Sequence, residues 1–151
     1  MITRLTACAL VEKGGRYLLV EERANGRIVL NNPSGRWEPG EILVQTCIRE
    51  AAEEAGISFE PRYVVGSYIT LHTSNTGQRV CTVRFTFGGD VRPEQPTVAP
   101  DSSILGTHWL SYQEVVAEQA RLRSSAILRG IDDARAGHKF PMHVINHMVD
   151  S

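Results

Sequence analysis

The chain has 151 residues, with 16 Lys and Arg against 17 Asp and Glu and a formal net charge of −1. This length fits one domain, residues 1–151, whose core is large enough to need no disulfide or metal for stability. Because the chain lacks the surplus of basic residues typical of general nucleic-acid binding, we do not expect a nucleic-acid polymer as its partner.

Three cysteines, Cys8, Cys47 and Cys81, lie far apart in apolar runs and form no C-x-x-C pair. We therefore expect reduced thiols in the core rather than disulfides or metal ligands. The first residues do not form a signal peptide, and no apolar run is long enough to span a membrane. The sequence predicts a cytoplasmic protein with no membrane partner, either a monomer or a homodimer.

The first forty residues have the pattern of short strands separated by turns. Gly14-Gly15 and Asn25-Gly26 are both typical of tight hairpin turns between apolar runs. Residues 31–40 contain two Pro and two Gly, so we expect a loop there. The strands expected around these turns lie at residues 5–11, 17–20 and 27–30.

Residues 43–55 are expected to form a helix that ends at Gly56, in the position of a left-handed cap. With about 100° between successive residues, the helix has two different sides. Apolar and small side chains share one side: Val44, Ile48, Ala51 and Ala55. Carboxylates share the other: Glu50, Glu53 and Glu54. We expect the apolar side to pack on a sheet and the acidic side to point outward.

The second half of the chain is expected to contain further strands at residues 63–71, 80–87 and 107–110. A long connection over residues 88–103 separates the last two. Arg84 and its neighbours two residues away are polar, whereas the residues between them are apolar, so this strand should have one core face and one polar face. Ser111 and Glu114 form a capping-box pattern that opens a helix, and a last helix is expected at residues 125–136.

Three carboxylates at spacings i, i+3 and i+4 on one helix face repel each other, at a cost of a few tenths of a kcal/mol per pair. Their hard oxygen atoms suit Mg²⁺, or Mn²⁺ as a substitute, and such a cation would offset the repulsion. An ion of this kind assists the attack of water on phosphorus. Arg49 is expected to bind the carboxylate of Glu41 through two hydrogen bonds. The alternative is a solvated acidic helix face.

The residues around this helix resemble the Nudix box, G-x5-E-x7-R-E-U-x-E-E-x-G-U, in which U is apolar. Every fixed position is filled at the required spacing: Gly35, Glu41, Arg49, Glu50, Glu53, Glu54 and Gly56. The resemblance implies an α/β fold, an α/β/α sandwich with a mixed β-sheet. It also implies a hydrolase dependent on Mg²⁺ or Mn²⁺ that cleaves nucleoside diphosphates linked to another moiety.

The same resemblance implies roles for individual residues. The metal would be bound by three carboxylates and one backbone carbonyl: Glu50, Glu53, Glu54 and Ser34. Glu53 would be either a further ligand or the base that activates water, and Glu41 with Arg49 would be a stabilising pair.

Segments outside the box, including residues 18–22, 31–35 and 122–124, look like the NudJ phosphatase branch of the family. That branch is associated with removal of phosphate from nucleoside tri- and diphosphates, thiamine pyrophosphate and hydroxymethylpyrimidine pyrophosphate. The chain departs from the branch at Arg36 and Trp37, which would add a phosphate contact or a stacking face at the mouth of the site.

Other residues have two interpretations each. Arg84 and Arg4 lie on the polar faces of their strands, where they contact either phosphate or water. Trp37 and Tyr68 either stack on a base or pack in the core. The chemistry also has alternatives: a nucleotide-sugar or dinucleoside-polyphosphate hydrolase, or a Nudix module that senses a nucleotide without cleaving it.

Overall fold

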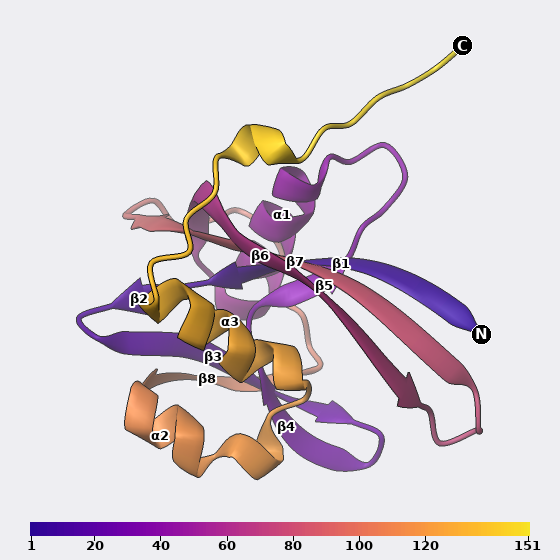
Figure 1. The fold of residues 1–151 in the computed structure, drawn as a ribbon. Helices are drawn as coiled ribbons and strands as arrows, with labels where there is room; N and C mark the ends of the chain where they lie inside the picture. Colours follow the sequence, from indigo (N-terminus) through magenta and orange to yellow (C-terminus); the bar gives the residue numbers. More distant parts are fainter.

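The computed structural model describes residues 1–151 as two four-stranded sheets with three α-helices (Figure 1). The first sheet contains, in spatial order, β5 (Ser34–Arg36), β1 (Ile2–Leu10), β7 (Arg79–Arg92) and β6 (Ser58–Thr73). The second contains β2 (Glu12–Lys13), β3 (Arg16–Ala24), β4 (Arg27–Asn31) and, on the other side of β3, β8 (Ile104–Ser111). The helices are α1 (Leu43–Ala55), α2 (Tyr112–Ala117) and α3 (Ser125–Arg135), with two 3₁₀ turns, η1 (Gln119–Arg121) and η2 (Met142–Val144).

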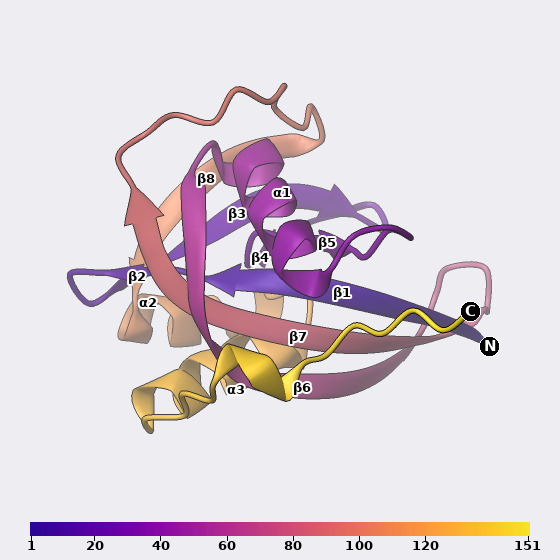
Figure 2. The same cartoon turned by 90° about the horizontal axis from the view of Figure 1, so that it is seen from above.

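The first sheet is mixed, because β1 runs parallel to β7 while its other pairings are antiparallel. Helix α1 covers one face of this sheet and α3 lies on the opposite side (Figures 1 and 2). This arrangement confirms the expected α/β/α fold with a mixed sheet. No helix is long and apolar enough to cross a membrane.

Two buried clusters hold these layers together. The first joins α1 to the first sheet and includes Ala7, Ala9 and Phe87. The second lies between the two sheets and α3 and includes Leu19 and Ile127. Successive residues of a strand point to opposite faces, so the residues of β1 and β7 that do not face α1 face the space between the sheets.

The polar face of β7 is not a solvent face. Arg84 is only 6% exposed and Thr86 only 1%, because the second sheet and α3 cover this side. The sequence left open whether Arg84 faces water or the interior, and the structure shows that it lies in the interior.

Helix α1 has the expected bounds, and Gly56 has the left-handed φ of 65° with its N–H bonded to the carbonyl of Ala52. The expected inward face was partly wrong. Ile48 is 39% exposed, whereas Cys47 is buried together with Leu43. The buried face of α1 is therefore formed by Leu43, Cys47 and Ala51 and is displaced around the helix from the expected one.

Two segments expected as loops contain strand residues. Ser34–Arg36 forms β5 and pairs with β1, and residues 88–92 extend β7 along β6. Both segments are rich in Gly and Pro, which predicted loops. Their strand pairing depends on partners far away in sequence, so it could not be predicted from the local composition. At Gly88 the absence of a side chain is required, since a Cβ there would collide with the ring of Tyr63.

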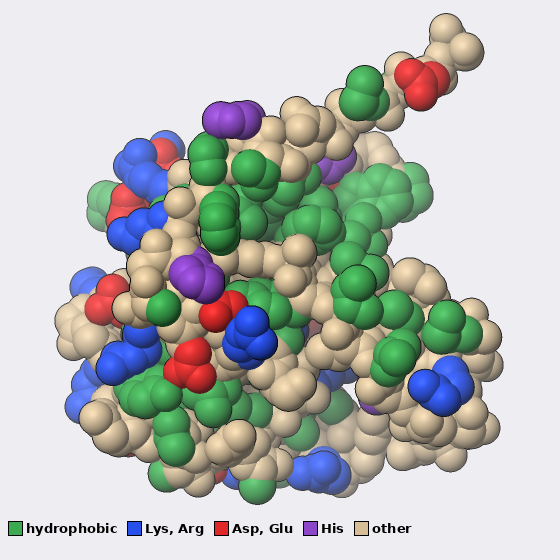
Figure 3. All heavy atoms as spheres, viewed as in Figure 1, with side chains coloured by type: hydrophobic (Ala, Val, Ile, Leu, Met, Phe, Trp, Pro, Cys, Tyr) green, Lys and Arg blue, Asp and Glu red, His purple; other side chains and the backbone are tan.

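The tail after α3 returns across the molecule to α1 (Figure 1). Phe140 exchanges two backbone hydrogen bonds with Val64, and Ile145 packs against the first cluster. The Nε2 atom of His147 then accepts a hydrogen bond of 3.0 Å from the backbone N–H of Leu43, at the start of α1. Figure 3 shows hydrophobic side chains gathered where the tail crosses the upper layer.

Candidate active site

Two carboxylates of α1, Glu50 and Glu54, lie against β5 rather than in open solvent. The backbone N–H of Ser34 donates a 2.8 Å hydrogen bond to Oε1 of Glu54. Glu50 lies against Gly35, where a Cβ would collide with its carboxylate. Gly35 is therefore required at this position by the close approach of a side chain from α1.

Arg49 binds Glu41 through two hydrogen bonds, from Nε to Oε2 at 2.7 Å and from Nη2 to Oε1 at 3.0 Å. Thr46 adds a third bond to Glu41, of 3.0 Å. The Arg49 hydrogen bond lowers the pKa of Glu41 to about 2. The contact expected between Arg49 and Glu41 is thus present, and it fixes the segment before α1 to the middle of the helix.

The acidic side of α1 carries more negative charge than its arginine balances. Burial, with repulsion from Glu22, Glu50 and Asp101, raises the pKa of Glu54 to about 8. Burial also raises the pKa of Glu50. A group of partly buried carboxylates that repel one another is the environment in which a divalent cation stabilises the charged forms.

The donor set consists of oxygen atoms only, which fits Mg²⁺ or Mn²⁺ rather than a metal that prefers sulfur or nitrogen ligands. No three of the His, Cys, Asp and Glu side chains surround a single point. Two of the carboxylates instead bind protein donors: Glu50 Oε1 accepts from Arg49 Nη1 at 2.7 Å, and Glu54 Oε1 accepts from the backbone N–H of Ser34. Because Arg49 contacts only Oε1 of Glu50, the Oε2 atom of Glu50 has no bond to Arg49.

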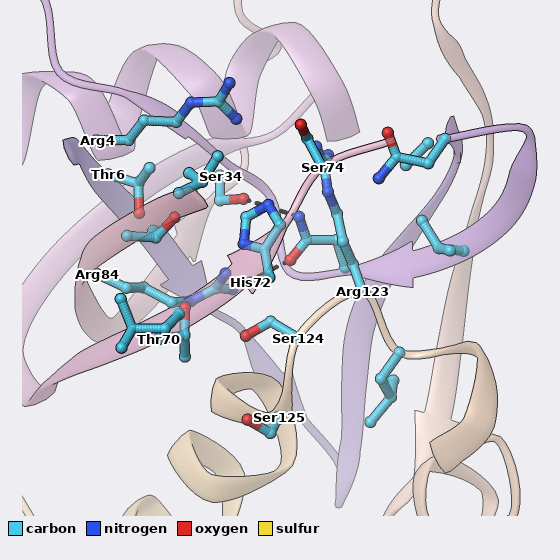
Figure 4. A pocket seen from close by; sticks show the side chains of 18 of the residues that line it. Arg4, Thr6, Ser34, Thr70, His72, Ser74, Arg84, Arg123, Ser124 and Ser125 are labelled. Atoms are coloured by element: carbon cyan, nitrogen blue, oxygen red, sulfur yellow. Dashed lines mark hydrogen bonds between the residues drawn. The ribbon is translucent and has the colours of Figure 1, made fainter. Parts of the chain in front are cut away.

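A cavity of about 580 Å³ lies between the sheets and shares Ser34 and Gly35 with the acidic side of α1. Its lining contains no Asp or Glu. It does contain five arginines, from β1, β4, β5, β7 and the segment before α3: Arg4, Arg27, Arg36, Arg84 and Arg123. Figure 4 shows three of them around the cavity together with serine and threonine side chains.

Arg84 is the most deeply buried of these arginines. Its Nη2 donates to the side-chain carbonyls of Asn31, at 3.1 Å, and Asn32, at 2.9 Å. Its Nε has no hydrogen-bond partner. The guanidinium therefore lies in the interior with two neutral amides and without a carboxylate.

The structure brings most of the predicted residues to these two regions. Arg4, Arg36 and Arg84 line the cavity. Trp37 does not: its Nε1 donates to the carbonyl of Glu41 at 2.7 Å and its ring packs against the first cluster. The structure thus shows Trp37 partly buried and packed against the core, outside the cavity, and its expected contact with substrate stays a prediction. Tyr68 likewise donates to Asp133, at 2.7 Å, outside this cavity.

Several residues of the site were not predicted from the sequence. Asn31 donates to Glu22 Oε1 at 3.3 Å and to Ser34 Oγ at 3.1 Å, while its carbonyl accepts from Arg84. It thus joins the acidic region to the arginine cavity. Arg123 donates to Glu22 at 2.6 Å. The contacts of Asn31 with Arg84 and of Arg123 with Glu22 join distant parts of the chain. In the sequence, Asn31 and Arg123 stood only within the segments 31–35 and 122–124 that resemble the NudJ branch.

Asp101 is a further unpredicted neighbour. Its backbone N–H donates to the carbonyl of Glu53 at 2.8 Å, which holds the loop before β8 against α1. Its charge contributes to the raised pKa of both Glu50 and Glu54.

Comparison with known proteins identifies the family. The NUDIX domain model matches residues 1–130. Phosphatase NudJ of Escherichia coli strain K12 is 31% identical over 141 residues, which cover 93% of this chain and 89% of that protein. A NUDIX hydrolase structure from Nitrosomonas europaea is 36% identical with a TM-score of 0.84, and 97% of each chain is covered. A MutT protein structure from Methanosarcina mazei Go1, with a TM-score of 0.64 and 21% identity over 91% of this chain and 97% of that chain, shares the fold. The chain therefore belongs to the Nudix hydrolase family.

Proposed function

We propose that this enzyme hydrolyses pyrophosphate bonds in small phosphorylated metabolites, using Mg²⁺ with Mn²⁺ as a possible substitute. The substrates proposed are nucleoside tri- and diphosphates, thiamine pyrophosphate and hydroxymethylpyrimidine pyrophosphate. One observation carries the proposal: an excess of carboxylates on α1 adjoins a cavity lined by arginines, and β5 forms the boundary between them. The carboxylates suit a cation, and the arginines suit phosphate.

We propose that Glu50, Glu53, Glu54 and the carbonyl of Ser34 hold the metal. When bound, a divalent ion polarises the phosphate and lowers the pKa of a coordinated water. Glu53 is either a further ligand or the base. As base, it accepts a proton from water while the water oxygen bonds to phosphorus and the bridging P–O bond breaks, with its electron pair leaving on the departing group.

Glu41 and Arg49 act as positioning residues in this proposal. Their paired hydrogen bonds hold Glu50 and the segment between β5 and α1 in place. Arg4, Arg36 and Arg84 bind phosphate oxygens, a role for which the planar guanidinium is well suited. The full set of α1 carboxylates supports hydrolysis over a module that only senses a nucleotide.

A phosphate-release panel tests the proposal. Wild-type enzyme with Mg²⁺ is incubated with thiamine pyrophosphate, nucleoside triphosphates and ADP-ribose, and free phosphate and the organic products are measured. We expect phosphate from the first two. Cleavage of ADP-ribose without free phosphate would instead assign the enzyme to the nucleotide-sugar hydrolases, and no cleavage of any of them would contradict the proposal.

A further inference from the structure

The arginine cavity has more positive charge than the protein neutralises. Arg123 is paired with Glu22 at 2.6 Å, but the other four arginines of the lining have no carboxylate within ion-pair distance. A protein that brings four unpaired guanidinium groups to one cavity gains stability when an anion enters it.

Arg84 gives the strongest evidence for an anion. It is 6% exposed, its Nε is unpartnered, and its only partners are the amide carbonyls of Asn31 and Asn32. A buried charge without a counter-ion is costly, and buried charges in proteins are normally paired or bound to a ligand. The free donors of Arg84 therefore mark a position for a negatively charged group.

Arg4 supports the same conclusion from the neighbouring strand β1, which pairs directly with β7. Its Nε is also buried without a partner. Burial, together with repulsion from Arg36 and Arg123, lowers its pKa. Arg4, Arg36 and Arg123, which come from three separate segments, thus line the same cavity, and only Arg123 has an acidic partner.

The rest of the lining indicates what kind of anion is bound. The lining contains no Phe, Tyr or Trp, so an aromatic base has no aromatic ring to stack on except the imidazole of His72. Hydroxyl groups are frequent instead, from residues such as Thr6, Thr82 and Ser124. Such a surface recognises charge and hydroxyl groups rather than an aromatic face.

We propose that the cavity binds a second phosphate-bearing group of the substrate, so that the preferred substrates are pyrophosphate esters of small, non-aromatic, phosphorylated polyols. This inference rests on the proposed function, because it assigns the organic part of the molecule whose pyrophosphate lies at α1. It also adds a preferred class to the proposed substrates: nucleotides, hydroxymethylpyrimidine pyrophosphate and thiamine pyrophosphate all carry an aromatic group, for which the lining offers no Phe, Tyr or Trp. We expect them to be cleaved less efficiently than a phosphorylated polyol pyrophosphate, and thiamine pyrophosphate, whose organic group is also cationic, least efficiently of all.

Anion binding is tested without hydrolysis, by calorimetric titration of inorganic triphosphate into the protein in EDTA. Arg84→Gln and Arg4→Gln each remove one unpaired guanidinium of the cavity. Arg23→Gln is the matched control, because Arg23 is exposed, makes no ion pair and does not line the cavity. We expect the cavity variants to weaken binding about tenfold each, the size of a charged hydrogen bond, and the control to bind as wild type.

If Arg84→Gln does not fold, Arg4→Gln still decides the question, because Arg4 is only partly buried. Equal affinity in wild type and Arg4→Gln, or an equal loss in Arg23→Gln, would overturn the anion site. Since no metal is present, this result does not depend on catalysis.

Substrate choice is then measured with Mg²⁺, by comparing kcat/KM for phosphoribosyl diphosphate and thiamine pyrophosphate. We expect a preference of at least about tenfold for the first, since loss of a charged contact is worth about that factor. Arg4→Gln should reduce this preference. If thiamine pyrophosphate is preferred, or if Arg4→Gln leaves the ratio unchanged, the inference fails while the proposed function stands. If neither compound nor any nucleotide is cleaved, the proposed function itself fails.

Discussion

The two regions that meet at β5 differ in how they are built and in how their charge is balanced. On the α1 side, the contacts among Glu41, Arg49 and Glu50 join residues close in sequence, and one arginine serves several carboxylates. On the cavity side, arginines from five segments converge and only Arg123 has an acidic partner. The first region thus has an excess of carboxylates, as our proposed cation site requires, and the second an excess of guanidinium groups, as our proposed anion site requires. The residues proposed for catalysis are therefore held together mainly by contacts close in sequence. The residues proposed to choose the substrate come together only when the whole chain folds.

Replacing the most buried carboxylate of the acidic region should have the largest effect. Glu54→Gln should lower turnover by several orders of magnitude, because metal and general-base contributions are of that size. The circular-dichroism spectrum should stay that of wild type, since Gln still accepts the Ser34 hydrogen bond. Glu118→Gln, at an acidic position outside the site, is the control. Near-normal turnover in Glu54→Gln would contradict the assignment.

A methyl group at Gly35 should disturb the boundary between the two regions. The Cβ of Gly35→Ala would collide with the flexible end of Glu50. We expect the fold to remain and turnover to fall about 100-fold, the cost typical of a misplaced catalytic group. Gly106→Ala is the matched control, because a Cβ there meets no atom within 4 Å. Equal activity of the two variants would show that the position of Glu50 is unimportant.

The acidic region should also make the metal-free protein sensitive to pH. The pKa of Glu54 is about 8 in the folded protein against an ordinary value of 4.5, so the folded state holds the proton more tightly than the unfolded state. Its contribution to stability is full below pH 4.5 and is lost as pH rises through about 8. In EDTA, the melting temperature of wild type should therefore fall more steeply over this interval than that of Glu54→Gln. Parallel curves for the two proteins would refute this.

The smallest effect is expected at the C-terminal tail. His147→Ala removes the acceptor for the Leu43 N–H at the start of α1, which should lower the free energy of unfolding by about 1 kcal/mol, as for other helix caps. His143→Ala is the control, since the His143 side chain is exposed and makes no hydrogen bond. Urea unfolding measures both, and equal loss in the two variants would exclude the capping role.

The sequence predicts α1, its Gly56 cap and the Arg49–Glu41 contact because each depends on residues within one or two helical turns. It predicts that Arg84 has a polar role but not that this residue is buried, since burial depends on a second sheet. The strand β5 was expected to be loop, because its partners on β1 lie far away in sequence. Asn31, Asp101 and Arg123 were missed for the same reason.

The buried face of α1 shows a second reason why sequence-based prediction is incomplete. Ile48 is more hydrophobic than Cys47, yet Cys47 is buried and Ile48 is exposed. Hydrophobicity alone favours burial of the larger side chain, whereas the observed buried face is set by which side of α1 packs on the sheet. On the neighbouring side, Glu50 and Glu54 contact β5.

The central claim is that α1 holds a cation while the cavity holds an anion. Titration of Mn²⁺ into metal-free wild type, Glu54→Gln and Arg4→Gln, followed by the electron paramagnetic resonance signal of free Mn²⁺, tests this separation directly. We predict that Glu54→Gln binds Mn²⁺ at least about tenfold more weakly than wild type, as expected for loss of one carboxylate ligand, and that Arg4→Gln does not. Undiminished binding of Mn²⁺ by Glu54→Gln would contradict the account.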